Sequence, residues 1–89
     1  MENNTQFVIA TDWITILARQ ISDSLKLGVI LIQWNIQDNL FVMRIEGDGG
    51  KKVAKLFEPS ELASFPLEGE NRAVFEAQLT RLLEFFKKK

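Results

Sequence analysis

Apolar and polar residues alternate along two adjacent stretches in the middle of the chain, within residues 29–46. Successive side chains of a strand point to opposite faces, so this alternation predicts a β-hairpin. Asp38-Asn39 lies between the two stretches and suits a two-residue turn, because both residue types tolerate positive φ. The turn pairs Ile36 with Phe41, and a slip by one residue would move every apolar side chain to the opposite face. We therefore expect the register of this hairpin to be strongly specified.

The predicted register sorts the side chains of the hairpin onto two faces that differ in polarity. One face is apolar without interruption, and its members are Ile30, Ile32, Trp34, Ile36, Phe41, Met43 and Ile45. The other face is half polar, and its members are Val29, Leu31, Gln33, Asn35, Leu40, Val42, Arg44 and Glu46. We expect the apolar face to form the core, with Trp34 near its centre.

A third strand is predicted between the glycine-rich turn at residues 47–50 and Pro59, which ends the strand. In the register that we favour, Asp48-Gly49 forms the tip of the turn, and Ala54 and Leu56 join the apolar face. The opposite face then receives Val53, Lys55 and Phe57.

A longer loop would invert this third strand. Val53 and Phe57 would then lie in the core, with Lys55 between them. We favour the first register because it places no lysine in the middle of a buried face.

Apolar residues recur at helical spacing on both sides of the three strands. Before the strands, Thr11 is a good N-cap and Gly28 suits the left-handed position that ends many helices, so we predict a helix over about residues 12–27. Residues 7–9 (Phe-Val-Ile) are either a fourth strand or a hydrophobic staple that leads into this helix, and we favour the staple. Residues 1–6 are polar and are expected to fray.

The last helix is predicted to begin near Asn71, after a connector at residues 58–70 in which Pro59 suits the first position of a short helical turn. The predicted buried stripe of this helix consists of Phe75, Leu79, Leu82, Leu83 and Phe86. Trp13 and Phe85 lie beside the main stripes of the two helices. We expect both rings to pack at the edge of the core.

The predicted order is α-β-β-β-α in a single α+β domain over residues 1–89. We expect a two-layer sandwich, in which two helices cover one face of a three-stranded antiparallel meander. The order of elements is similar to that of small acidic secretion chaperones, which act as dimers. This similarity of topology implies a chaperone-like or adaptor-like role and a homodimer.

Composition narrows the possible functions. The chain is 46% apolar and 26% charged, as globular proteins are, and its net charge of −1 provides no overall attraction to nucleic acid or to an anionic membrane. It contains no histidine, cysteine or tyrosine, which removes the commonest general base and the best thiol nucleophile. We therefore predict a non-enzymatic protein without cofactor or bound metal.

The lack of cysteine favours a cytoplasmic location, and the apolar run at residues 29–32 is too short to span a membrane.

The half-polar face of the predicted sheet is the first candidate for a functional surface. Under the favoured register it presents Leu31, Leu40, Val42, Arg44, Val53, Lys55 and Phe57. An apolar patch rimmed by charge is typical of a contact surface, so it predicts a protein partner or a homodimer. The alternative, which we favour slightly, is that the connector folds back and covers this face with Phe65 and Leu67.

The segment at residues 47–55 resembles the end of the double-stranded RNA-binding domain, where a glycine-containing loop leads into a Lys-Lys-x-Ala-Lys helix start. The resemblance implies that Lys51, Lys52 and Lys55 contact RNA phosphates. The alternative function is therefore a nucleic-acid-binding module that uses these three lysines and Arg44. The resemblance covers only this segment, and only two strands precede it where that family has three. The interpretation that we favour is a hairpin turn whose solvated lysines protect an edge strand.

Acidic residues gather in the connector and the last helix, at Glu58, Glu61, Glu68, Glu70 and Glu76. Paired carboxylates can transfer protons or hold Mg²⁺. Because nothing in the predicted elements fixes their geometry, we interpret them as a hydrated acidic surface.

Overall fold

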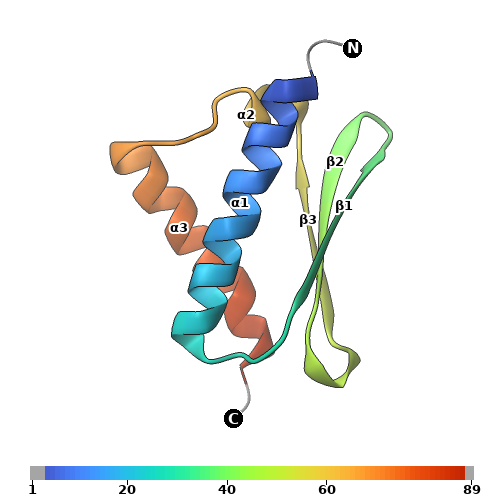
Figure 1. Cartoon of the computed structure of the whole chain (residues 1–89), viewed down its shortest axis with the longest axis vertical. Coiled ribbons are helices and arrows are strands. Elements are labelled where there is room, and N and C mark those ends of the chain that lie inside the picture. The colour runs from blue at the N-terminus through green and yellow to red at the C-terminus, as the bar shows by residue number, and fades with distance from the viewer. Residues whose placement is uncertain (1–3, 88–89) are drawn as a thin grey trace.

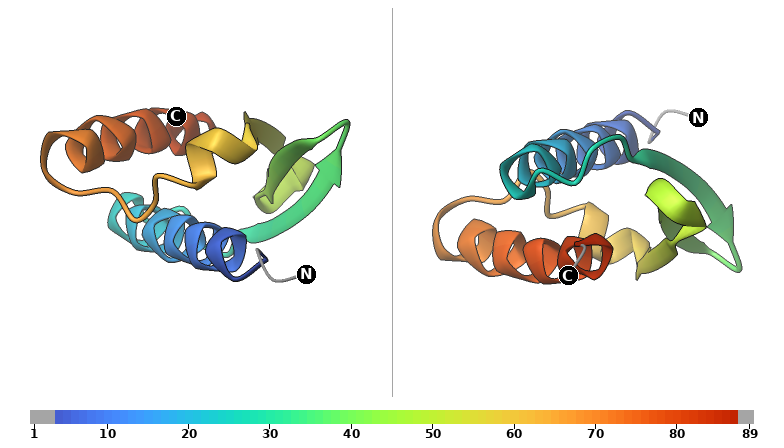
Figure 2. Two further views of the ribbon diagram at one scale, coloured as in Figure 1. Left: turned by 90° about the horizontal axis from the view of Figure 1, so that it is seen from above. Right: turned by 90° about the horizontal axis from the view of Figure 1, so that it is seen from below.

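The computed structural model describes residues 4–87 and has two layers, as Figures 1 and 2 show. Helices α1 (Asn4–Leu25) and α3 (Gly69–Leu83) form one layer. Strands β1 (Leu31–Gln37), β2 (Leu40–Glu46) and β3 (Lys52–Phe57) form the other, an antiparallel sheet in the order β1-β2-β3. The short helix α2 (Pro59–Leu62) follows β3. This arrangement confirms the predicted α+β sandwich.

The hairpin of β1 and β2 has the predicted register. Ile36 pairs with Phe41, and Trp34 pairs with Met43. Asp38 and Asn39 form the turn with φ values of 53° and 66°. Positive φ at both central residues defines the type I′ turn, whose twist matches that of the flanking strands.

The register that we favoured for β3 is wrong by one residue. Phe41 pairs with Phe57 and Met43 with Lys55, so Phe57 lies in the core and Val53 packs against it. The turn is longer than expected and spans Asp48–Gly50, where Gly49 and Gly50 both have a φ of 80°; the N–H of Gly47 donates to the carbonyl of Lys51 across it at 2.9 Å.

We expected Lys55 to disfavour this register, but the register accommodates its side chain. It is only half-buried, because β3 is an edge strand, and its Nζ lies 5.2 Å from the centroid of the Phe57 ring. The side chain therefore reaches the rim of the core and keeps its ammonium at the surface.

Helix α1 begins at Asn4, eight residues before the predicted start. Its buried stripe includes Ala10 and Ile14, and Phe7 extends the stripe to the Phe41 ring, 4.9 Å away between centroids. Residues 7–9 are thus helical, neither a strand nor a staple. Thr11 does not cap the helix; its hydroxyl donates to the carbonyl of Val8 at 3.2 Å inside it. Of the residues expected to fray, 4–6 belong to α1, and 1–3 lie outside the described residues.

Lys26, and not Gly28, holds the left-handed position at the C-terminal end of α1. Lys26 has a φ of 58°, and its N–H donates to the carbonyl of Asp23 at 3.1 Å. The N–H of Leu27 donates to the carbonyl of Ser22 at 3.1 Å. These two bonds form a Schellman motif, in which glycine usually holds the left-handed position. Gly28 also has a positive φ, of 85°, but lies beyond the motif.

Met43, and not Trp34, occupies the centre of the core. Met43 lies on the middle strand and is fully buried. Trp34 lies on the edge strand β1 and is half-buried; its Nε1–H donates to Oγ1 of Thr15 at 2.9 Å. Ile36 lies on the apolar face as predicted but is 66% exposed.

The connector packs between the helices and not on the back of the sheet. Pro59 begins α2, as predicted, and the backbone N–H of Glu58 donates to the Glu61 carboxylate at 3.0 Å. The Phe65 ring lies 5.4 Å from Trp13 and 5.2 Å from Phe75, between centroids. The interpretation that this segment covers the half-polar face is therefore wrong.

Helix α3 begins at Gly69, two residues earlier than predicted. Its expected stripe is buried, apart from the half-buried Leu82. A 3₁₀ turn at Glu84–Phe86 continues the helix and buries Phe86. Phe85 is 53% exposed, so it lies further outside the core than we expected.

Candidate protein-interaction site

The half-polar face of the sheet contains only part of the predicted contact surface. Leu31, Leu40, Val42 and Arg44 lie on it, as predicted. Val53, Lys55 and Phe57 do not, because the register of β3 turns them toward the helices. The strand contributes Lys52, Ala54 and Leu56 to this face in their place.

This face is less apolar than the sequence predicted. Leu31 and Leu56 are 55% and 56% exposed and lie on opposite edge strands. Val42 lies between them on β2 but is only 3% exposed. A shallow recess on the same face contains charges of both signs, from Arg44, Glu46 and Lys52. The face therefore presents separated apolar side chains among polar ones.

The two edges of the sheet differ sharply in charge. Strand β1 has the sequence LIQWNIQ, without a charged residue or a proline. Strand β3 carries Lys52 and Lys55, and Pro59 follows it. Lysine and proline at an edge hinder pairing with a further strand. No strand within residues 4–87 pairs with the outer edge of β1.

An apolar recess of about 470 Å³ opens beside β1, between the start of α1 and the tip of the hairpin. It is lined by Phe7, Val8, Thr11, Trp34, Asn35, Ile36 and Phe41. Val8 and Ile36 are 54% and 66% exposed. We did not predict this recess, because residues 7–9 were not assigned to the helix. The sequence did contain a signal for this longer helix, because the spacing of Phe7 and Ile14 places both residues on the same helix face.

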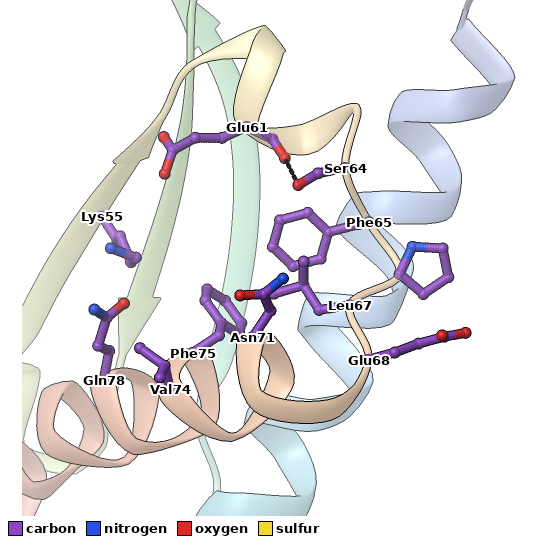
Figure 3. Close-up of a pocket in the computed structure, with 11 residues that line it drawn as sticks. Lys55, Glu61, Ser64, Phe65, Leu67, Glu68, Asn71, Val74, Phe75 and Gln78 are labelled. Atoms are coloured by element: carbon purple, nitrogen blue, oxygen red, sulfur yellow. Dashed lines mark hydrogen bonds between the residues drawn. The ribbon is translucent and has the colours of Figure 1, made fainter.

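A second, mixed pocket of about 650 Å³ lies between β3, α2 and α3 (Figure 3). Phe65, Leu67 and Phe75 provide its apolar lining, and Lys55, Glu61 and Gln78 lie across the pocket from Phe65 and Leu67. Two of its polar groups already stabilise the connector. The Glu61 carboxylate accepts from the backbone of Glu58, and the Ser64 hydroxyl donates to the Glu61 carbonyl at 2.7 Å.

The basic residues proposed to contact RNA do not share one surface. Arg44 and Lys52 lie on the half-polar face. Lys51 extends over the Phe85 ring, 5.6 Å from its centroid, and Lys55 extends over Phe57 on the other face of the sheet. The segment that resembled a helix start is strand β3 in the structure.

The acidic residues of the connector also remain dispersed. Within residues 4–87, no group of three acidic side chains is placed to hold a metal ion. Glu58 and Glu61 form the capping box of α2, which gives this pair a structural role.

None of the helices within residues 4–87 contains an apolar stretch of the length that crossing a membrane requires.

Comparison with models of known protein families, with curated proteins and with solved structures found no significant match.

Proposed function

We propose that this chain is a non-enzymatic protein-interaction module that binds a second protein chain along the outer edge of β1. The observation that carries the proposal is the contrast between the two edges of the sheet. Strand β1 has no charge or proline over its whole length, whereas β3 carries two lysines and ends before Pro59.

The backbone of an edge strand supports such binding directly. Its outward N–H and C=O groups form a row of donors and acceptors that an extended segment of another protein can pair with. Main-chain hydrogen bonds provide affinity in this mode, and pockets for alternate side chains provide specificity.

The recess beside β1 supplies such a pocket. Phe7 and Phe41 line it with apolar surface, and Val8 and Ile36, which also line it, are each more than half exposed. An apolar side chain of an added strand would remove these groups from water, and the transfer of each CH₂ out of water is favourable by about 0.8 kcal/mol before the costs of association are counted. A cytoplasmic location remains a prediction of the sequence.

A charge on β1 tests the proposal. Asn35→Lys places a lysine at the edge of β1, and Ala54→Lys places one on the same face of the sheet at the β3 edge, as a matched control. Both positions are exposed, so both variants should fold. Proteins captured from a cell extract by the immobilised wild type and by Ala54→Lys should be lost with Asn35→Lys. Equal capture by all three, or failure of the immobilised wild type to bind any protein, a tagged second copy of this chain included, would contradict the proposal.

A further inference from the structure

We infer that the chain that pairs with β1 is a second copy of the same protein, related to the first by a two-fold axis that passes beside Trp34. This inference rests on the proposed function, because it names the partner of the same edge. Four properties of the edge support it: the direction of its backbone groups, their spacing, the side chains that would face each other, and the charges on the flank of α1.

The turn of the hairpin determines which backbone groups point outward. In a two-residue turn, the residues that flank it, here Gln37 and Leu40, form a hydrogen-bonded pair. Hydrogen-bonded and non-bonded pairs alternate along an antiparallel ladder. The N–H and C=O groups of Ile32, Trp34 and Ile36 therefore point away from β2, toward the open edge.

These outward groups are arranged symmetrically about Trp34. If the Trp34 residues of two antiparallel copies lie opposite each other, Ile32 of each copy lies opposite Ile36 of the other. Every outward N–H and C=O of both strands then has a partner. A shift by two residues in either direction leaves the outward groups at one end of each strand without a partner from β1. The edge therefore pairs with itself best in the register centred on Trp34.

The side chains are compatible with this register. Gln33 faces Asn35 of the second copy on the half-polar face, where the two amides can exchange hydrogen bonds. Ile32 faces Ile36 of the second copy on the other face. Ile36 is 66% exposed in one copy, and this contact would bury it. Because β1 has no charge, no like-charge pair opposes the association.

The flank of α1 shows charge complementarity about the same axis. Thr15 accepts the hydrogen bond from the Trp34 indole, so this part of α1 lies level with Trp34. Asp12 and Arg19 are exposed and lie about one helical turn on either side of Thr15. Both share a flank of α1 with Val8, which lines the recess beside Ile36.

The two-fold axis would bring Asp12 of one copy toward Arg19 of the other. Figure 2 shows that α1 lies on the side of the molecule where β1 lies, whereas α3 lies on the side of β3. The α1 flanks of the two copies therefore meet along the joined edges. Opposite charges placed in this way favour the dimer over other registers.

The lysines on the outer edge of β3 hinder the addition of further copies, so the assembly is limited to two chains. Pairing through β1 uses the same surface on both copies, which closes the contact. The remaining outer edges are then the two β3 strands, with Lys52 and Lys55 on each. The result is one continuous sheet of two copies with the helices of both on the same face.

Disulfide trapping tests the edge and the register together. The chain contains no cysteine, so introduced thiols are the only ones. In the proposed register, residues 33 and 35 of opposite copies form a non-bonded pair with Cα atoms about 4.5 Å apart, within the range that a disulfide spans. A mixture of Gln33→Cys and Asn35→Cys chains, one of them tagged, should form a mixed disulfide under mild oxidation.

Each variant alone should form far less disulfide, because equal positions of the two copies are about 7–8 Å apart diagonally. Gln33→Cys mixed with Ala54→Cys is the control for random collision. Mass spectrometry of the non-reduced products measures the yield of each pair. A mixed disulfide between positions 33 and 35 no more abundant than the control pair would overturn the inference.

Solution mass provides the second measurement. The wild type should sediment at twice the 10.2 kDa of the chain at micromolar concentration. The variant Gln33→Lys/Asn35→Lys places lysine opposite lysine and should sediment at the mass of one chain. The variant Gln33→Lys/Asn35→Glu places lysine opposite glutamate in this register only, and it should remain a dimer.

The outcomes separate this inference from the proposed function. A wild type with the mass of one chain at every concentration would overturn the second copy as partner. The pull-down with Asn35→Lys would still decide whether β1 binds another protein. A wild-type dimer that persists in Gln33→Lys/Asn35→Lys would show that the copies meet through a different surface, and this result would also overturn the inference.

Discussion

Phe57→Ala is expected to be far more destabilising than Leu56→Ala, although the two residues are neighbours on β3. Phe57 is 1% exposed, and its ring lies 5.5 Å from that of Trp34 and 6.2 Å from that of Phe75, between centroids. Removing a buried phenylalanine ring lowers the free energy of unfolding by about 3–5 kcal/mol. Leu56 is 56% exposed, so its truncation should cost only about 1 kcal/mol.

Urea unfolding followed by tryptophan fluorescence measures both changes. A domain of 89 residues has a free energy of unfolding of about 4–13 kcal/mol, so the loss expected for Phe57→Ala equals the whole stability at the lower end of this range. Phe57→Leu then serves as a milder variant, because it keeps most of the volume and loses the ring contacts, each of which contributes about 0.5–1.5 kcal/mol. A larger loss for Leu56→Ala than for either Phe57 variant would refute the register of β3.

Three further variants test local features of the fold by the same unfolding measurement. Lys26→Gly should stabilise the protein by about 1 kcal/mol, because glycine adopts a φ of 58° without steric strain, and a loss of stability would contradict the Schellman motif. Ser22→Ala should be neutral or stabilising by about 1 kcal/mol, because the Ser22 hydroxyl is buried without a hydrogen-bond partner among the described residues; a marked loss would mean that the hydroxyl is bonded. Thr15→Val should cost about 1 kcal/mol by removing the acceptor of the Trp34 indole, and an unchanged midpoint would show that this bond does not stabilise the fold.

The hairpin could be predicted because two independent signals agree on its register. The turn residues Asp38-Asn39 and the alternation of apolar residues both place Ile36 opposite Phe41. The register of β3 had only one such signal. A run of glycines permits turns of several lengths, so residues 47–50 did not determine which face of β3 was buried.

The choice between the two β3 registers then depended on Lys55, and this choice was wrong. A lysine is excluded from a buried face only where its ammonium cannot reach water. On an edge strand the long side chain reaches the surface while its stem covers Phe57. The predicted meander already placed this strand at an edge of the sheet, so Lys55 was no reason to reject the register.

The start of α1 was misplaced for a related reason. Thr11 and Asp12 resemble a helix N-terminus locally, but the apolar phase of the helix continues through Ala10 to Phe7. Packing of Phe7 on Phe41 outweighs the capping preference of one threonine, which is about 1 kcal/mol. The recess beside β1 depends on this extra length of helix and could not be predicted without it.

Amide hydrogen exchange of β1 over a concentration series tests the central claim most directly. At low concentration, the amides of Gln33 and Asn35, which face β2, should be protected, while those of Ile32, Trp34 and Ile36 exchange rapidly. At high concentration, the second group should become protected together as the copies pair. Exchange of these three amides at one rapid rate across the whole series would contradict the pairing of β1 with a second copy.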